Sequence, residues 1–205
     1  MSQGTEKSVI GRIYGSGRGR AFSQKDFADL GARKAIAMAL MRLADRAIIR
    51  RVIRGIYDYP RQSKLLGKEM GPDIHQVAQA LARKFGWRIQ PSGATALNLI
   101  GLSTQVPGRY TYQSDGPHRT YPIGKTPLSF QKLALKEAGF RHEASSVIVQ
   151  ALKALGQAHI TDETITIIRK WLPTGKRSDV LKDTRRVTGW VYEAIQRICA
   201  GESNG

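Results

Sequence analysis

The stretch from Phe22 to Pro60 constrains the fold of this chain more than any other segment does. Ser23 is followed three residues later by Asp26, a spacing that is typical of the capping box at the start of a helix. Gly31 is suited to end that helix in a left-handed conformation, because glycine has no Cβ to clash there. A second helix is predicted directly after it, over residues 32–46. The segment therefore predicts two helices joined by a tight turn.

The second of these helices is amphipathic and leads into a short hairpin. Its predicted buried stripe recurs at helical spacing and consists of Ile36, Leu40, Leu43 and Ala47. Two β-prone runs follow over residues 48–52 and 55–59, with Arg54-Gly55 as the turn between them and Pro60 after the second. Two helices and a short hairpin in this order are the outline of a winged helix-turn-helix.

A helix over residues 5–14 and a glycine-rich loop over residues 15–20 precede this segment. The loop resembles a phosphate cradle only superficially, because no apolar strand precedes it and no Lys-Ser/Thr pair follows it. Arg18 and Arg20 in the loop either reach into a DNA minor groove as an arm or belong to a flexible connector. The sequence leaves these two alternatives open.

The chain is strongly basic, and its positive charge is concentrated near the N-terminus. It holds 33 Lys and Arg against 16 Asp and Glu, which gives a formal net charge of +17. Residues 1–62 contribute 13 basic and 5 acidic side chains, whereas the much longer remainder contributes 20 and 11. A basic excess gathered on one small module indicates a phosphate-binding face. We therefore expect this module to bind double-stranded DNA.

The predicted helix over residues 32–46 has the properties of a recognition helix, which packs one face in the core and presents the other to the major groove. The face opposite its apolar stripe carries Lys34, Met38, Met41 and Arg42, and Arg33 lies in its first turn. An arginine that reaches a guanine edge contributes about 1–3 kcal/mol of base discrimination. Met38 offers apolar contact to a thymine methyl group. The alternative is that the basic side chains of this helix form an ordinary solvated face.

Three arginines lie in or beside the turn of the predicted hairpin, and we expect two of them to contact backbone phosphates. They are Arg50, Arg51 and Arg54. Because side chains alternate along a strand, Arg51 faces away from Arg50 and the two cannot serve the same contact. Ser23 and Lys25 are expected to add a phosphate site at the start of the first helix of the pair, since helix N-termini attract anions.

Residues 61–72, which contain glycine and proline, are expected to link this domain (residues 1–62) to a second domain over residues 72–205. The second domain is predicted to be mixed α/β, with a small antiparallel sheet and a helical C-terminal end. Its predicted helices span residues 73–85, 92–100, 143–155, 162–171, 178–186 and 189–200. Its predicted strands span residues 109–114, 119–123 and 128–133, the first two forming a hairpin around Asp115-Gly116-Pro117. The fold class expected for the whole chain is therefore α+β, mainly helical.

No pattern in the sequence predicts an enzyme, a metal site or a cofactor. The four histidines are far apart, and none has metal-ligand spacing with a cysteine or a second histidine. No apolar run approaches the ~18 residues of a membrane span. The single cysteine, Cys199, is expected to fill apolar space in the last helix, and a lone cysteine fits a reducing cytoplasm. The basic pairs Arg83-Lys84, Lys176-Arg177 and Arg185-Arg186 are either solvated helix ends or an extension of the DNA-binding surface.

Six short segments are distinctive in combination. In the first domain they are residues 25–31 (Lys-Asp-Phe-Ala-Asp-Leu-Gly), 37–43 (Ala-Met-Ala-Leu-Met-Arg-Leu) and 54–60 (Arg-Gly-Ile-Tyr-Asp-Tyr-Pro). In the second domain they are residues 89–94 (Ile-Gln-Pro-Ser-Gly-Ala), 98–107 (Asn-Leu-Ile-Gly-Leu-Ser-Thr-Gln-Val-Pro) and 112–117 (Tyr-Gln-Ser-Asp-Gly-Pro). Together they resemble the AbiEi-type family of antitoxins and transcriptional regulators, over nearly the whole chain.

This resemblance implies a bacterial two-gene toxin–antitoxin module of the type IV class. It implies that the N-terminal winged helix binds repeats at its own promoter and represses it. It also implies that the C-terminal domain counters a nucleotidyltransferase-like toxin, with or without a stable complex between the two proteins. It carries no functional residues over to the second domain.

Two functions of different classes follow as hypotheses. The first is a sequence-specific repressor that autoregulates a toxin–antitoxin operon and acts as the antitoxin through its C-terminal domain. For such a repressor we expect paired, inverted half-sites in the operator. The second is a protein-interaction module that sequesters a toxin or another partner, with DNA binding secondary. A nucleic-acid-modifying enzyme is the weakest alternative, because the chain offers no candidate catalytic residues.

Overall fold

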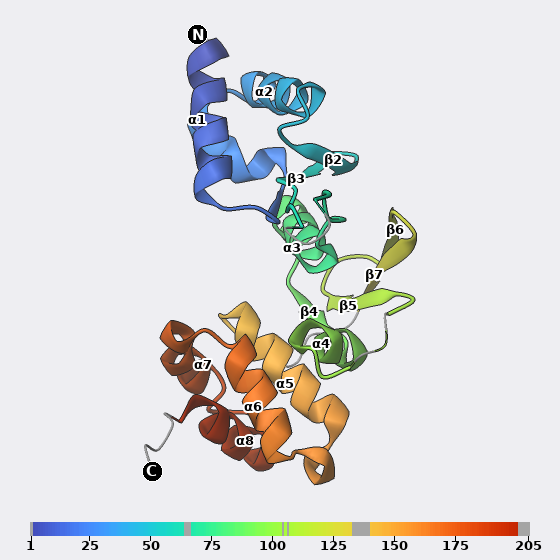
Figure 1. Cartoon of the computed structure of the whole chain (residues 1–205), viewed down its shortest axis with the longest axis vertical. Helices are drawn as coiled ribbons and strands as arrows, with labels where there is room; N and C mark the ends of the chain where they lie inside the picture. Colours follow the sequence, from blue (N-terminus) through green and yellow to red (C-terminus); the bar gives the residue numbers. More distant parts are fainter. Residues whose placement is uncertain (1, 64–66, 104, 106, 133–139, 201–205) are drawn as a thin grey trace. The chain divides into compact units, whose positions relative to one another are not determined.

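A computed structural model describes residues 2–63, 67–103, 105, 107–132 and 140–200 of the chain (Figure 1). The described residues form an α+β fold with more helix than strand and two small sheets, which is the fold class expected from the sequence. The chain divides into two compact units, residues 1–87 with 121–128, and residues 88–120 with 129–205. The first unit thus continues past residue 62, where the sequence places the end of the first domain. Residues 64–66 of the expected linker and Leu133 of the third predicted strand lie outside the described residues.

The first unit contains four helical elements and a three-stranded sheet in the described residues. In chain order these are α1 (Ser2–Gly15), β1 (Ala21–Phe22), the 3-10 helix η1 (Gln24–Leu30), α2 (Arg33–Asp45), β2 (Arg50–Ile53), β3 (Ile56–Asp58) and α3 (Ile74–Phe85). The strand order is β1-β3-β2, and both pairings are antiparallel. The turn between β2 and β3 falls at Arg54-Gly55, as predicted, with a φ of 75° at Gly55.

Three helical elements of the first unit, α1, η1 and α2, pack through one apolar cluster. Its buried members come from α1, β1, η1, α2 and the chain before β2, and they are Val9, Ile13, Phe22, Phe27, Ile36, Ala39, Leu40, Leu43 and Ile49. The rings of Phe22 and Phe27 meet edge to face with 5.3 Å between their centroids. A contact between the residue before a helix cap and the fourth residue of the helix fixes the direction in which the chain enters that helix.

The start of η1 has the predicted capping box, but its end differs from the prediction. Ser23 Oγ accepts a hydrogen bond from the Lys25 amide, and the Asp26 carboxylate accepts one from the Ser23 amide, at 3.2 and 2.7 Å. The left-handed cap expected at Gly31 is wrong, because Gly31 has a φ of 155° and a ψ of −173°. Gly31 instead forms an extended link into α2, and a side chain there would press against Thr5 of α1.

α2 ends at Asp45, and this shortens its buried stripe. Three of the predicted stripe residues are buried, namely Ile36, Leu40 and Leu43. The fourth, Ala47, is exposed and has a φ of 55°, so its assignment to the stripe is wrong. The reversal at Ala47 lets the amides of Ile48 and Ile49 bond to the last turn of α2. Ile49, only 2% exposed, then takes the buried position.

α3 has the start and the end that the sequence predicts, but it packs as part of the first unit. Asp73 caps its start by accepting hydrogen bonds from the amides of His75 and Gln76, at 3.0 and 3.2 Å. Gly86, in the left-handed conformation, ends it. α3 contacts β1, β3 and η1, which explains why the compact unit reaches beyond residue 62.

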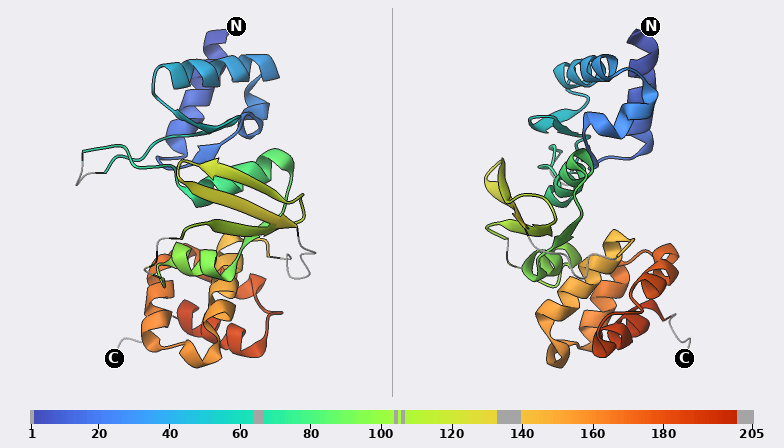
Figure 2. Two further views of the ribbon diagram at one scale, coloured as in Figure 1. Left: turned by 90° about the vertical axis from the view of Figure 1, so that its right-hand side faces the viewer. Right: turned by 180° about the vertical axis from the view of Figure 1, so that it is seen from behind.

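The four-stranded sheet has a different topology from the predicted one. It consists of β4 (Ile89–Pro91), β5 (Tyr110–Ser114), β6 (Arg119–Ile123) and β7 (Thr126–Lys132), in the order β4-β5-β7-β6. Because β7 lies between β5 and β6 (Figure 2), the hairpin predicted around Asp115 is wrong. Asp115 instead accepts two hydrogen bonds from Arg88 beside β4, at 2.8 and 2.9 Å. The tight turn falls between β6 and β7, where Gly124 has a φ of 58°.

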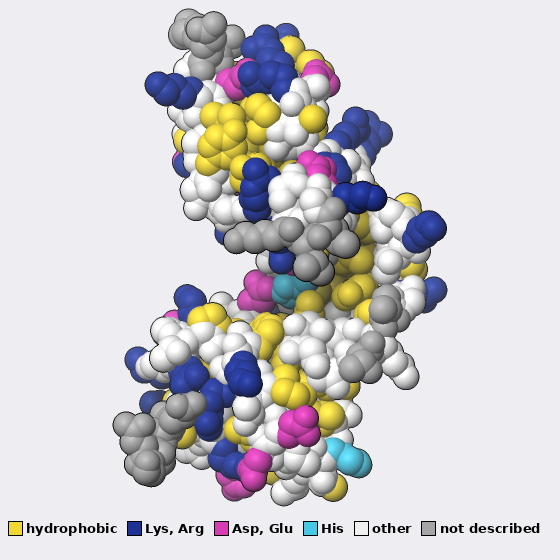
Figure 3. Space-filling view, viewed as in Figure 1, with side chains coloured by type: hydrophobic (Ala, Val, Ile, Leu, Met, Phe, Trp, Pro, Cys, Tyr) yellow, Lys and Arg dark blue, Asp and Glu magenta, His cyan; other side chains and the backbone are white. Residues whose placement is uncertain are grey.

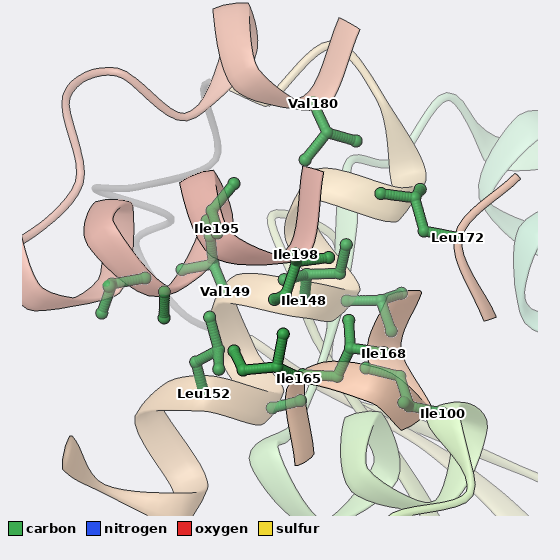
Figure 4. Close-up of a cluster of buried hydrophobic side chains, with 14 of the residues drawn as sticks. Ile100, Ile148, Val149, Leu152, Ile165, Ile168, Leu172, Val180, Ile195 and Ile198 are labelled. Atoms are coloured by element: carbon green, nitrogen blue, oxygen red, sulfur yellow. The ribbon is translucent and has the colours of Figure 1, made fainter. Parts of the chain in front are cut away.

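The helices of the second unit lie within three residues of their predicted bounds. They are α4 (Gly93–Ile100), α5 (Glu143–Leu155), α6 (Asp162–Trp171), α7 (Arg177–Asp183) and α8 (Gly189–Cys199). Their apolar faces meet in one core, which Figure 4 shows with side chains from each of these five helices or their ends. Cys199 lies in this core as expected, and burial raises the pKa of its thiol. A thiol with a raised pKa is a poor nucleophile at neutral pH.

Replacing Gly93 by alanine should destabilise the protein, although alanine normally favours a helix by about 0.5–1 kcal/mol over glycine. A Cβ at Gly93 would lie 2.5 Å from the Cβ of Ala154 on α5. The two helices would have to separate, and overpacking of this kind costs about 1–3 kcal/mol. We expect the free energy of unfolding, measured by urea denaturation, to fall by roughly 1–2 kcal/mol. Gly11→Ala is the matched control, because a Cβ at Gly11 meets no atom within 4 Å. If both variants gained stability, the close approach of α4 to α5 would be refuted.

Candidate nucleic-acid interface

α2 presents a continuous exposed face opposite its buried stripe. This face, the outer face of α2, is formed by Arg33, Lys34, Ala37, Met38, Met41 and Arg42. Met38 and Met41 are 38% and 46% exposed, which is unusual for large apolar side chains. A helix that enters a DNA groove needs one face in the core and the opposite face in solvent. α2 meets this requirement at the residues that the sequence selects.

Arg42 differs from the other bases of the outer face, because a carboxylate lies beside it. Glu6 of α1 forms an ion pair with Arg42 Nη1 at 3.6 Å and a closer one with Arg46. These three residues, with Ile10 among others, line a pocket of about 590 Å³ between α1 and the end of α2. The charge of Arg42 is therefore partly balanced within the protein.

Arg50 holds the hairpin together. Its guanidinium donates to both carboxylate oxygens of Asp58, at 3.0 and 2.5 Å, and to the Met70 carbonyl at 2.9 Å. The Asp58 side chain is only 2% exposed. Burial raises the pKa of the Asp58 carboxyl, although Arg50 beside it acts in the opposite direction. The structure thus engages Arg50 inside the protein rather than at the expected phosphate contact.

Arg51 and Arg54 extend into solvent from the same hairpin. Arg51 lies opposite Tyr57 in the register and points away from Arg50, as strand alternation predicts. Arg54 lies at the tip, and its carbonyl accepts a hydrogen bond from Lys84 Nζ of α3 at 3.2 Å. Burial, together with the charge of Arg54, lowers the pKa of Lys84. The hairpin tip is therefore anchored by its backbone, while both arginine side chains remain exposed.

The expected phosphate site at the start of η1 is filled by the protein itself. Ser23 is 1% exposed, and its hydroxyl donates to the Asp26 carboxylate at 3.0 Å. Asp26 in turn binds Arg83 Nε of α3 at 2.5 Å, and Arg83 also donates to the Ala21 carbonyl at 2.9 Å. A buried hydroxyl beside a carboxylate cannot receive a phosphate, so Ser23 leaves the candidate interface. Lys25 remains exposed.

The glycine-rich loop is held against the hairpin. Arg18 lies over the Tyr59 ring, 4.4 Å from its centroid, and donates to the Pro60 carbonyl at 2.8 Å. The amide of Gly19, whose φ is 90°, donates to the Tyr59 carbonyl at 2.6 Å. These contacts make the loop an ordered part of the first unit. Arg18 and Arg20 are both exposed.

The acidic side chains of the first unit are largely matched with arginines. The ion pairs are Glu6 with Arg42 and Arg46, Asp26 with Arg83, Asp29 with Arg12, Asp58 with Arg50, and Asp73 with Arg61. The hydrogen bonds from Arg12 lower the pKa of Asp29 to about 2, so this carboxylate stays ionised near neutral pH. These pairs occupy one set of arginines and leave another set free to act outside the protein.

Arg18 is exposed as well, but it is engaged by Tyr59 and Pro60. Six other basic residues that the sequence selects in the first unit remain exposed, with no acidic oxygen within 4.0 Å in the described part of the chain. We call them the free basic residues, and they are Arg20, Lys25, Arg33, Lys34, Arg51 and Arg54. They come from the glycine-rich loop, η1, the first turn of α2 and the β2–β3 hairpin. The two residues that sequence reasoning undervalued are Arg83 and Lys84, which anchor η1 and the hairpin tip.

Among the described residues, no group of three or more His, Cys, Asp or Glu side chains is placed to hold a metal ion. No described helix combines the length and the apolar character needed to cross a membrane.

A match to a protein-family model places this chain in a family whose function is not known. Residues 9–180 match the model of the family of unknown function DUF6088, and the chain belongs to that family. Among solved structures, it is similar to the crystal structure of the RV2827C protein from Mycobacterium tuberculosis. That similarity has a TM-score of 0.35 and 10% sequence identity, and it covers 88% of this chain and 71% of the other. No curated protein sequence matches the chain.

Proposed function

We propose that the first unit is a winged helix-turn-helix that binds double-stranded DNA, with α2 as the recognition helix and β2–β3 as the wing. In this proposal Arg33, Lys34 and Met38 face the major groove. Arg51 and Arg54 contact the phosphate backbone beside it. The protein then acts as a sequence-specific transcriptional repressor.

The observation that carries this proposal is that the basic residues of the first unit separate into two sets, those with an acidic partner and those without one. The carboxylates of the first unit take up arginines such as Arg50 and Arg83, which bind other parts of the protein. The free basic residues come from the glycine-rich loop, η1, the first turn of α2 and the hairpin. Basic side chains that have no acidic partner are available to replace the counterions of DNA phosphates. The number of such contacts sets the salt dependence of binding.

The exposed methionines add a second reason to prefer DNA over a simple polyanion. Met38 and Met41 lie on the same face of α2 as Lys34. Apolar contact with thymine methyl groups is one of the ways in which proteins read bases in the major groove. Exposed apolar side chains would contribute nothing to a surface that binds only phosphates.

The resemblance to AbiEi-type antitoxins extends the proposal to the whole chain. We propose that the protein represses its own toxin–antitoxin operon and that the second unit counters a nucleotidyltransferase-like toxin. The competing proposal is a protein-interaction module that sequesters its partner, with DNA binding secondary. Co-purification of a stable complex with the product of the neighbouring gene at high salt would favour that second proposal.

The experiment that tests DNA binding is a titration of the full-length protein against its own upstream DNA and a scrambled duplex, at two salt concentrations. Specific readers commonly prefer their site by about 10³-fold or more. A preference of that size would support an autoregulating repressor. Equal and steeply salt-dependent affinity for both duplexes would reduce the interaction to phosphate attraction. Absence of binding to either duplex would refute the proposal.

A further inference from the structure

The second unit contains a basic pocket that the proposed DNA contacts do not involve. It lies between the start of α5 and the end of α7 and has a volume of about 580 Å³. Four basic side chains from two segments line it, namely Arg141 before α5, and Lys182, Arg185 and Arg186 at the end of α7 and just after it. Figure 3 shows Lys and Arg side chains gathered over α7. We call this the α5–α7 pocket.

The backbone that carries these bases is held in place by buried and hydrogen-bonded groups. The two carboxylate oxygens of Asp183 accept hydrogen bonds from the amides of Arg141 and His142, both at 3.0 Å. Thr184 is fully buried, and its hydroxyl donates to the Val180 carbonyl at 2.8 Å. Asp183 and Thr184 lie between Lys182 and Arg185 in the chain, so the bases project from a fixed frame. A frame that is set before binding reduces the entropy lost when a ligand is held.

The four basic side chains of the α5–α7 pocket outnumber its two carboxylates, which leaves an excess of positive charge. Its acidic members are Asp179 and Asp183, and Asp183 already accepts the two amides before α5. No ion pair joins the four basic side chains to an acidic oxygen within 4.0 Å in the described residues. Because Asp183 occupies the start of α5, the helix end itself is not the binding group. The basic side chains are.

We propose that the α5–α7 pocket binds a chain of adjacent phosphate groups, carried by a nucleotide or present as a free polyphosphate. Arginine is suited to this role because its planar fork donates two parallel hydrogen bonds to a phosphate. The volume falls within the range of about 300–1,000 Å³ that is usual for small-ligand sites. The four bases converge on one hollow instead of following a line, which favours a compact polyanion over an extended nucleic-acid backbone.

The test is isothermal titration of the full-length protein with tripolyphosphate and with ATP. Arg185→Ala/Arg186→Ala is the pocket variant. Arg109→Ala/Lys170→Ala is the control, because it removes two other exposed basic residues of the same unit, which do not line the pocket. We expect the pocket variant to bind tripolyphosphate at least about tenfold more weakly, since two charge-assisted hydrogen-bonding groups are lost. The control should bind like the unaltered protein.

The two ligands distinguish the source of the phosphates. Equal affinity for tripolyphosphate and ATP would mean that the phosphate chain alone is recognised, whereas tighter binding of ATP would identify a nucleotide. No binding of either ligand, or equal weakening in the pocket variant and the control, would overturn the proposal. So would binding of a mixed-sequence single-stranded oligonucleotide that depends on Arg185 and Arg186 without any binding of the smaller ligands. The result is independent of the DNA proposal, which depends on α2 and is tested with variants of Arg33 and Lys34.

Discussion

Replacing Arg33 and Lys34 together by alanine should weaken binding of the full-length protein to its upstream DNA by about 100-fold. Each of the two side chains is expected to contribute about 1–1.5 kcal/mol by contacting a nucleobase edge or a phosphate. Each 1.4 kcal/mol is a factor of about ten in affinity. Both side chains are exposed in the first turn of α2, without an acidic partner in the described structure. Neither supports the fold, so the loss should appear in binding and not in stability.

The salt dependence of the same titrations separates the two kinds of contact. Loss of one phosphate contact lowers the slope of log affinity against log salt by about 1, whereas loss of a base contact changes sequence preference instead. Lys7→Ala/Lys68→Ala is the control, because it removes two exposed lysines of the first unit outside the proposed interface. An equal loss of affinity in both double variants would show that only net charge matters. Unchanged affinity in Arg33→Ala/Lys34→Ala would exclude α2 as the recognition helix.

Arg50→Ala and Arg51→Ala should change different properties of the protein, although the two arginines are adjacent. The first should lower stability, and the second should lower DNA affinity. Arg50→Ala leaves the Asp58 carboxylate buried without its partner, and removing one member of a buried pair costs about 3–5 kcal/mol. Because the Arg50 side chain is 29% exposed, we expect a smaller cost than this range, about 2–3 kcal/mol of unfolding free energy. Arg51→Ala should change stability by less than about 0.5 kcal/mol and should reduce DNA affinity.

Urea denaturation of both variants, followed by the DNA titration, measures this difference. The slope of the unfolding curves should stay unchanged while the midpoint of Arg50→Ala falls. Asp58→Ala and the double variant complete a thermodynamic cycle that isolates the coupling between the two side chains. A coupling energy near zero, or equal midpoints for Arg50→Ala and Arg51→Ala, would mean that the pair does not hold the hairpin together.

The helices that the sequence predicts most accurately are those whose ends are defined by neighbouring residues. α3 begins after Asp73 and ends at Gly86, and α4 begins after Ser92. In each case the capping side chain bonds to an amide two or three residues away. Such bonds depend on local sequence alone, so the pattern of residues is sufficient to find them.

Local sequence is insufficient where a distant residue decides the outcome. Ser23 looked available for a phosphate until Asp26 and Arg83, 57 residues apart, were found to meet beside it. Strand alternation separates Arg50 from Arg51, but only the pairing of β2 with β3 decides that Arg50 is the one that binds Asp58. The insertion of β7 between β5 and β6 likewise depends on long-range pairing.

The sequence by itself determined the fold class, the bounds of most helices, the amphipathic character of α2 and the excess of bases near the N-terminus. These properties follow from hydrophobic periodicity, caps and composition, which act over a few residues at a time. Only the tertiary structure decided which basic residues are free for a ligand and that α3 belongs to the first unit. It also decided that one pocket is lined by Arg141, Lys182, Arg185 and Arg186. Whether a charge is satisfied depends on what packs against it, and in this protein those neighbours come from distant parts of the chain.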